Sequence, residues 1–558
     1  ALTQEVAYGG LLMRVRKVLH ESAARLGEEV FAKRLEAEAP FFAHHYWEAG
    51  LAGDAAPHLW IAGRAAAEAY ELPAAEEFLG RLAEATAKDA QDLLTGDDRA
   101  RFLEMYGNVL LHRGRLEDAD VRFGELEREG EEAGRAEWTA RGIEYRGRTA
   151  WYRGELDAAE AFFERGLNRL PPSQDRIEAD LHNDLGIVYY YRGRPEDAFA
   201  QHTAALDLRK RLGDRLGMAK SYTNIGNLLA DFRDDLAGAE EHYRRGLEMA
   251  EAVGDRQMQY STLFNLATIT QDRGEWIQAI EIFRKGERLL EEIGWGHARY
   301  QNLQKQAESE IALGQIDHAL RHLQACLSRG DAVLEPVNRV NTRAFLFDAY
   351  LRACAYETAE VAVVDARRLV DELHVDEALE GVLLREGRWR AAQGRWAEAA
   401  EVFGEAADQA RSHNHASFAA LAEAHRYRAR ARAGERDVET TATLLHGKTP
   451  LLAVIGYLHA DAAAEREPTP EVAAALERVA DEAARLGDPG LERAAAERLA
   501  QVWRACGDEA ASVTAIERAA QAMAAVEAGL PKDLAEAFAA HPRNAVLRQV
   551  LDAPGSRR

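Results

Sequence analysis

Apolar residues recur at helical spacing along most of this chain, and small residues interrupt them at regular intervals. Leu181, Leu185 and Val188 fall three or four residues apart, which places them on one face of a helix. After the turn at Gly193 the pattern resumes at Ala198. A pattern of this kind predicts pairs of antiparallel helices, each burying one apolar face against its neighbours.

A short motif marks the turn inside each pair and returns about every 40 residues. It begins with a small residue and ends five positions later with alanine in most copies, as in Gly114 to Ala119. The successive first residues are Gly114, Gly154, Gly193, Asp234, Gly274, Gly314, Cys354, Gly394 and Gly434. This is roughly the period of stacked helical hairpins, so the sequence predicts an all-α fold, a right-handed α-solenoid.

The period fails after residue 440. Pro450, Pro468 and Pro470 fall in one short stretch, and the next glycine in phase is Gly507. We therefore expect four segments. They are an N-terminal helical segment (1–54), the superhelix (55–440), an irregular helical insertion (441–470), and C-terminal helical hairpins with a tail (471–558).

The repeat resembles the tetratricopeptide family over about residues 55–440. The small residue of helix A in that family corresponds here to Gly107, Gly147, Gly186, Gly226, Ala267, Ala307 and Gly387. The helix-B aromatic residue corresponds to Phe123, Phe163, Tyr243, Phe283 and Phe403. Phe347 departs from the pattern, so we expect looser or shifted packing there. His202 and Leu323 replace the helix-B aromatic.

Both ends of the chain carry a second resemblance. The segments Ala1–Tyr8, Phe42–Tyr46 and Leu530–Leu534 resemble parts of bacterial STAND-type signalling ATPases, which end in tetratricopeptide arrays. These include multidomain kinases, cyclases and transcriptional activators. The resemblance implies a sensor region that follows a fused ATPase or effector module missing from this sequence. The alternatives are that both ends are helical caps, and that the chain is a free-standing scaffold that assembles a protein complex.

The tetratricopeptide resemblance also implies a ligand-binding site. In the family, helix A lines a concave groove. The matching groove positions are Arg101, Asn108, Arg141, Glu144, Arg148, Trp151, Tyr152, Asn183, Tyr190, Tyr191, Lys220, Asn227, Phe264, Gln271 and Gln304. Amides, arginines and aromatic rings suit peptide backbone, carboxylates and apolar side chains, so the expected partner is a protein or peptide. A merely solvated inner face is the alternative, and Tyr190 and Tyr191 could instead fill a crowded core.

The composition of the chain argues against several classes of partner and site. The formal net charge of −24 opposes a phosphate backbone, so we expect no nucleic-acid partner. Three scattered cysteines suggest neither a disulfide framework nor a zinc site. The longest apolar stretch, Leu451 to Leu458, is too short to cross a bilayer. These features favour a cytoplasmic protein without a membrane partner.

Two motifs suggest a phosphate-binding loop and a metal site, but the neighbouring residues support neither. Residues Ala442–Thr449 satisfy a relaxed phosphate-loop pattern, but no strand-like segment precedes them and Pro450 follows directly. His44 and His45 are adjacent, and neighbouring helical side chains point about 100° apart, so they cannot ligate one metal without outside partners. We therefore expect no catalytic residues, no metal site, no cofactor and no enzymatic activity.

Overall fold

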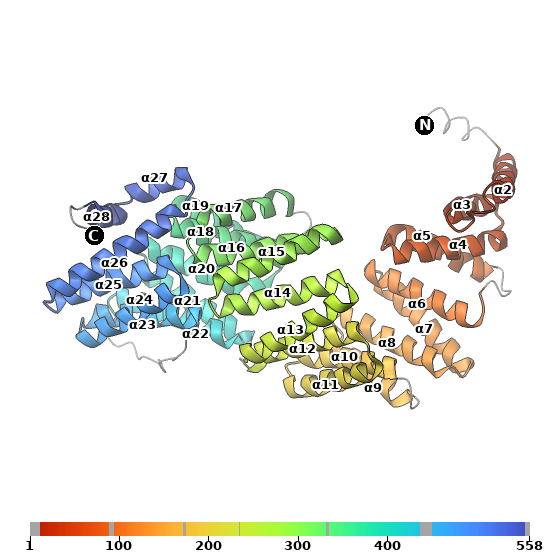
Figure 1. Cartoon of the computed structure of the whole chain (residues 1–558), viewed down its shortest axis with the longest axis horizontal. Helices are drawn as coiled ribbons and strands as arrows, with labels where there is room; N and C mark the ends of the chain where they lie inside the picture. The colour runs from red at the N-terminus through yellow and green to blue at the C-terminus, as the bar shows by residue number, and fades with distance from the viewer. Residues whose placement is uncertain are drawn as a thin grey trace. The chain divides into compact units, whose positions relative to one another are not determined.

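The computed structural model describes residues 12–88, 94–170, 175–233, 235–330, 334–413, 415–435 and 449–552. Over these ranges the chain is almost wholly helical and carries no strand, which confirms the all-α prediction (Figure 1). The chain forms two compact units, Ala1–Arg233 (unit 1) and Asp234–Arg558 (unit 2). The segment Ala1–Tyr8, which carries part of the ATPase resemblance, lies outside the described residues.

Unit 1 consists of successive helices joined by short turns. They are α2 (Met13–Val30), α3 (Ala39–Ala49), α4 (Ala52–Glu68), α5 (Leu72–Lys88), α6 (Gly96–His112), α7 (Leu116–Glu132), α8 (Ala136–Tyr152), α9 (Leu156–Arg169), α10 (Asp175–Tyr191), α11 (Pro195–Leu212) and α12 (Arg215–Arg233). From α6 onward, even-numbered helices are the A helices of the predicted hairpins in this unit.

Unit 2 continues with the same kind of hairpin. Its first part contains α13 (Leu236–Val253), α14 (Arg256–Asp272), α15 (Trp276–Ile293), α16 (Gly296–Ala312), α17 (Ile316–Ala325), η1 (Cys326–Gly330), α18 (Pro336–Arg352), α19 (Tyr356–Leu373) and η2 (Asp376–Ala378). Its second part contains α20 (Leu379–Ala392), α21 (Trp396–Ser412), α22 (Ala416–Arg432), α23 (Pro450–Arg466), α24 (Pro470–Leu486), α25 (Pro489–Ala505), α26 (Glu509–Ala528), α27 (Lys532–Ala540) and α28 (Pro542–Leu551).

The turn glycines adopt the backbone conformation that the motif predicted. Gly114, Gly154 and Gly394 have φ of +73°, +78° and +77°, in the left-handed region that a residue without Cβ enters at little cost. Cys354 occupies the same turn position with φ +56°, so it pays the steric cost that glycine avoids. The motif read from the sequence therefore marks structural turns inside the hairpins.

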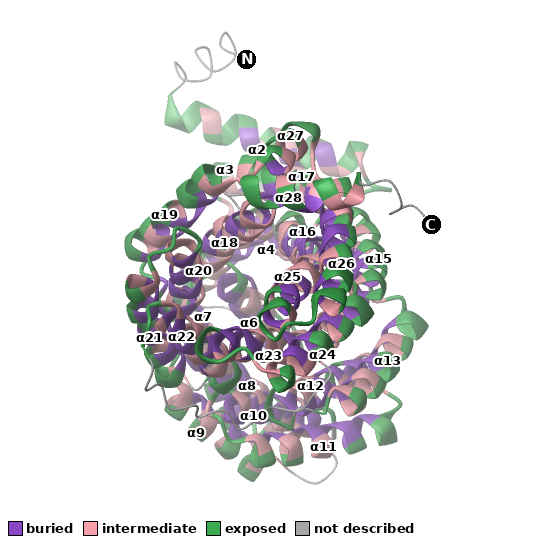
Figure 2. Cartoon of the chain, turned by 90° about the vertical axis from the view of Figure 1, so that its left-hand side faces the viewer, coloured by how far each residue is buried: buried purple, intermediate pink, exposed green. Residues whose placement is uncertain are grey.

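The hairpins close through the pairing of small and aromatic residues that the sequence predicted. A Cβ on Gly107 would lie 2.4 Å from a ring carbon of Phe123, and one on Gly147 would lie 2.5 Å from Phe163. His202 replaces the aromatic residue and fills the same space, 1% exposed, against Gly186. Buried positions accordingly follow the helix faces that meet neighbouring helices (Figure 2).

Of the looser or shifted packing expected at Phe347, the looser alternative is wrong. Phe347 is fully buried, and the following helix carries Val363 at the position where other hairpins carry phenylalanine. Both residues belong to one buried cluster of α16 to α19. Large and small side chains have exchanged places, so the core keeps its volume.

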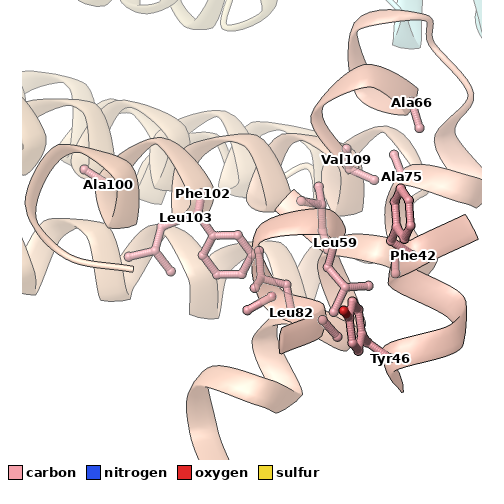
Figure 3. Packing of buried hydrophobic residues seen from close by; sticks show 14 of the residues in the cluster. Phe42, Tyr46, Leu59, Ala66, Ala75, Leu82, Ala100, Phe102, Leu103 and Val109 are labelled. Atoms are coloured by element: carbon pink, nitrogen blue, oxygen red, sulfur yellow. The ribbon is translucent and has the colours of Figure 1, made fainter. Parts of the chain in front are cut away.

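The N-terminal helices share a core with the first repeats. One buried cluster extends from Phe42 and Tyr46 of α3 through Leu59 of α4 to Phe102 and Leu103 of α6 (Figure 3). Helices before residue 55 are therefore packed parts of unit 1.

Unit 2 folds back on itself through its last helices. Gly274, in the turn between α14 and α15, meets Leu486 of α24, and a Cβ there would lie 2.2 Å from that side chain. In the next turn, between α16 and α17, Gly314 lies against Pro489 of α25. The N–H of Asp317 also donates to the carbonyl of Gly529 at 2.8 Å. The C-terminal helices thus cover the A–B turns of earlier hairpins in the same unit.

The segment 441–470 contains the regular helix α23. Thr449 caps it by accepting a hydrogen bond from the N–H of Leu452 at 3.4 Å, and Pro450 is its first residue. The remainder of the phosphate-loop pattern, residues 442–448, lies outside the described residues. Over the described ranges, the search for a helix both long and apolar enough to span a bilayer found none.

Candidate functional site

Five aromatic side chains form a continuous row at the C-terminal turns of α8, α10 and α12 in unit 1. In spatial order they are Tyr152, Trp151, Tyr191, Tyr190 and Phe232, and we call these five residues the aromatic row. Successive ring centroids lie 4.8, 5.9, 5.3 and 5.3 Å apart, and all four pairs are tilted or edge-to-face. Because the three helices are A helices of successive hairpins, the row crosses three repeats.

Much of the aromatic row is accessible to solvent. Tyr191, Tyr152 and Phe232 are 61%, 54% and 41% exposed, whereas Trp151 and Tyr190 are partly buried. The hydroxyl of Tyr190 donates to a carboxylate oxygen of Asp231. Burial raises the pKa of Asp231, and this hydrogen bond opposes the rise. Contiguous exposed aromatic surface is typical of interaction sites.

The predicted groove arginines of α8 take part in ion pairs within the chain. Arg148 pairs with Asp184 at 2.5 Å and with Glu144 at 2.7 Å. Arg141 pairs with the other oxygen of Glu144 at 2.7 Å and with Asp180 at 3.1 Å. Glu144 is fully buried; burial raises its pKa to about 7, and the charges of Arg148 and Arg141 oppose the rise.

The network extends to α11 through a buried arginine. Arg209, 2% exposed, donates to Asp180 at 3.1 Å, to the side-chain oxygen of Asn183 at 3.2 Å and to Ser221 at 2.8 Å. Asn183 in turn donates to Asp184 at 3.2 Å. Arginines and carboxylates of α8, α10 and α11 therefore hold successive repeats together close to the aromatic row.

Two further predicted residues border a hollow of about 530 Å³ between α4 and α6. Arg101 is exposed, and Asn108 donates to the carbonyl of Glu104 at 2.9 Å. Tyr70 and His112 also line this hollow, with ring centroids 5.8 Å apart. On α12, Lys220 is exposed and Asn227 partly buried.

The three predicted positions in unit 2 do not share one exposed face. Gln271 and Gln304 are each 3% exposed, and Gln304 donates to the carbonyl of Asn338 at 2.6 Å. Phe264 is partly buried against the rings of Tyr260 and Phe283. The expectation of accessible amides at Gln271 and Gln304 is wrong, because neighbouring helices cover both.

Sequence reasoning missed several residues that the structure brings forward. Phe232 completes the aromatic row, one position beyond the offsets used to select groove residues. Glu380, His413 and His415 have side-chain ligand atoms within 4.8 Å of one another, and these residue types can bind a metal ion. His415 Nδ1 lies 2.6 Å from Glu380, and the signal in the sequence was the His-x-His spacing. His45 likewise finds an outside partner in His20, at 2.7 Å.

Comparisons with known proteins agree with this architecture. Residues 178–252, which include Tyr190, Tyr191 and Phe232, match the tetratricopeptide repeat family. Residues 178–252 thus carry tetratricopeptide repeats within this array of helical hairpins.

Three solved structures resemble the chain weakly. Aspartyl phosphate phosphatase F from Bacillus subtilis is 15% identical, covering 62% of this chain and 91% of its own, with a TM-score of 0.44. A Rap protein complexed with competence and sporulation factor is 14% identical, covering 67% and 98%, with a TM-score of 0.40. The apo form of RapI is 12% identical, covering 69% and 99%, with a TM-score of 0.43. These similarities are too weak to transfer a function.

Proposed function

We propose that unit 1 binds a protein or peptide segment along the aromatic row. The observation that carries the proposal is the continuity of five rings across three successive A helices, with three of the rings more than 40% exposed. Aromatic side chains anchor partners with large contact area at low entropic cost, and peptide grooves reuse this arrangement. The role proposed is binding, without catalysis.

The residues in and around the aromatic row would have different roles in binding. Exposed Tyr152, Tyr191 and Phe232 would contact apolar side chains of the bound segment. Arg141 and Arg148 would keep the helices in register through their internal ion pairs. Lys220 and Asn227 on α12, with Arg101 and Asn108 on α6, remain proposed polar contacts.

Peptide selection from a phage-displayed library of random peptides tests the proposal. Fluorescence anisotropy should show that the double variant Tyr191→Ser/Phe232→Ser binds a selected peptide at least about tenfold more weakly, since hot-spot anchors commonly contribute about 2 kcal/mol. The matched control is Val121→Ser/Leu212→Ser, which removes side chains 50% and 43% exposed on α7 and α11. Equal loss in both variants, or failure to select any peptide, would contradict the proposal.

The setting of this binding role is a separate proposal. We infer a sensor region fused to an upstream signalling ATPase, supported by the resemblance of the terminal segments. A free-standing scaffold is the alternative. A full-length gene that encodes a phosphate loop and a magnesium-binding acidic strand before this region would favour the sensor. A gene without them would favour the scaffold.

A further inference from the structure

Unit 2 contains a hollow of about 480 Å³ on the inner side of its A helices. Residues of α16, α18, α20 and α22 line one part of it, and α23, α25 and α26 line the rest. The ion pair between Arg352 and Asp488 lies in its wall, where the C-terminal helices meet the earlier hairpins. Its volume falls in the range of small-molecule sites, about 300–1,000 Å³.

Positive charge predominates in the lining of this hollow. Five arginines line it, namely Arg352, Arg385, Arg388, Arg428 and Arg493. The carboxylates in the lining are Glu308, Asp348 and Asp488. A chain with a net charge of −24 has therefore gathered an excess of cations around this one hollow.

Carboxylates near the hollow are shared between arginines. Asp348 pairs with Arg385 at 2.7 Å and with Arg388 at 2.5 Å. Asp461, which is fully buried, pairs with Arg428 as well as with Arg432 and Arg498. Glu465 also pairs with Arg432 and Arg498. In both groups the guanidiniums outnumber the carboxylates by one, which leaves part of the positive charge uncompensated.

The directions in which two pKa values shift agree with that excess. Burial lowers the pKa of Arg388, and the charges of Arg385 and Arg352 lower it further, although Asp348 opposes the shift. Burial also lowers the pKa of His425 well below its usual range, with added repulsion from Arg388 and Arg428. An anion placed among these groups would relieve the repulsion.

Register places the key side chains at equivalent positions of successive repeats. Glu308, Asp348, Arg388 and Arg428 recur at the 40-residue period, each directly after the position that the family fills with a small residue. Arg148 holds the same position in unit 1. The offset that places Arg148 in the family's groove therefore gives these four positions as well.

The rest of the lining is apolar. It includes Phe345, Leu384, Leu421, Leu451, Val454 and Leu491. Arg428 also lies 5.6 Å from the ring centroid of Tyr457, which borders the hollow. A ligand for this space needs an anionic group and an apolar body.

We propose that the hollow in unit 2 binds a small organic anion, with its oxyanion held by Arg388 and Arg428 and its apolar part packed against Leu384, Leu421 and Leu491. Planar guanidiniums match the oxygens of both carboxylate and phosphate groups. Such a site is independent of the peptide site proposed in unit 1.

Isothermal titration calorimetry on the full chain tests this proposal with four probes. They are 4-phenylbutyrate, phenyl phosphate, inorganic phosphate and the neutral 4-phenylbutanol. We expect binding of at least one aromatic anion, with weaker binding of inorganic phosphate and none of the alcohol. The relative affinities of phenylbutyrate and phenyl phosphate decide whether the head group is a carboxylate or a phosphate. No binding of either aromatic anion, or equal binding of the alcohol, would overturn the proposal.

Variants locate the binding site. Arg388→Met should weaken binding of the anion at least tenfold, whereas Arg321→Met, at a 63% exposed side chain on α17, should leave it unchanged. Ala494→Trp places a bulky side chain in the lining of the hollow without replacing an arginine and should also abolish binding. Circular dichroism confirms that each variant is folded. Unchanged affinity in folded Arg388→Met or folded Ala494→Trp would place the anion elsewhere and refute the assignment.

Discussion

Arg352 and Asp488 form a two-pronged ion pair across 136 residues of sequence, with N–O distances of 2.6 and 2.9 Å. Asp488 also caps α25, because its side chain accepts a hydrogen bond from the N–H of Leu491 at 3.0 Å. The carboxylate of Asp488 therefore caps α25 and also links this helix to α18 through the ion pair with Arg352. This pair is part of the contact by which unit 2 folds back on itself.

Asp488→Ala should destabilise unit 2 by about 2 kcal/mol or more, because it leaves the partly buried Arg352 guanidinium without its main partner and removes a helix cap. Urea unfolding followed by circular dichroism measures the change. Asp508→Ala is the matched control, since Asp508 caps α26 through a 2.9 Å hydrogen bond from Ala511. That change should cost only about 1 kcal/mol. If both variants lose the same free energy of unfolding, the ion pair makes no contribution to stability.

Phe347 and Val363 should behave as a coupled pair. Phe347→Ala opens a cavity and should cost about 3–5 kcal/mol, and Val363→Phe overpacks the same cluster and should cost about 1–3 kcal/mol. The double variant recreates the small–aromatic order of the neighbouring hairpins. Its loss in unfolding free energy should be smaller than the sum by at least about 1 kcal/mol. Strict additivity in a double-mutant cycle would disprove the exchange of sizes.

His202 should make the stability of unit 1 depend on pH. Burial and, to a smaller extent, Arg209 lower its pKa from 6.5 to about 3. Between about pH 6.5 and pH 3, this histidine is therefore protonated in the unfolded chain but neutral in the folded chain. The free energy of unfolding consequently decreases as the pH falls from 6.5 towards 3. From pH 7.5 to 5.5 this histidine should account for a loss of about 1.4 kcal/mol.

The variant His202→Phe restores the aromatic residue of the other hairpins and should lose about 1.4 kcal/mol less than the parent over that interval. Chemical unfolding at both pH values measures the difference. His318→Gln, at an exposed position, should leave the parent's pH dependence intact. A pH dependence unchanged in His202→Phe would mean that other groups cause it.

Four members of the aromatic row could be expected to lie together because repeats translate sequence position into spatial position. Trp151, Tyr152, Tyr190 and Tyr191 meet in one row because equivalent turns of successive A helices lie side by side. Their contacts come from a local rule applied once per repeat. Phe232 joins the row one position later in its helix, so a fixed offset missed it.

The ion-pair partners of the charged residues could not be predicted from their positions in the repeat. Arg141 and Arg148 look like free ligand clamps in the sequence, yet the structure pairs both with Glu144. A sequence pattern gives the direction of a side chain on its helix but not the distance to charges on other helices. Gln271 and Gln304 show the same limit, because their burial depends on which helices cover them.

The sequence by itself determined the helical hairpins, their turns, the pairing of small residues with aromatic residues and the A-helix face that carries the aromatic row. Each of these follows from contacts within one repeat or between adjacent repeats, where spacing along the chain fixes spacing in space. Only the tertiary structure decided that the C-terminal helices return to Gly314 and Arg352 and enclose the arginine-lined hollow. Such contacts join residues more than a hundred positions apart, and they depend on the accumulated rotation of many hairpins, which no local pattern encodes.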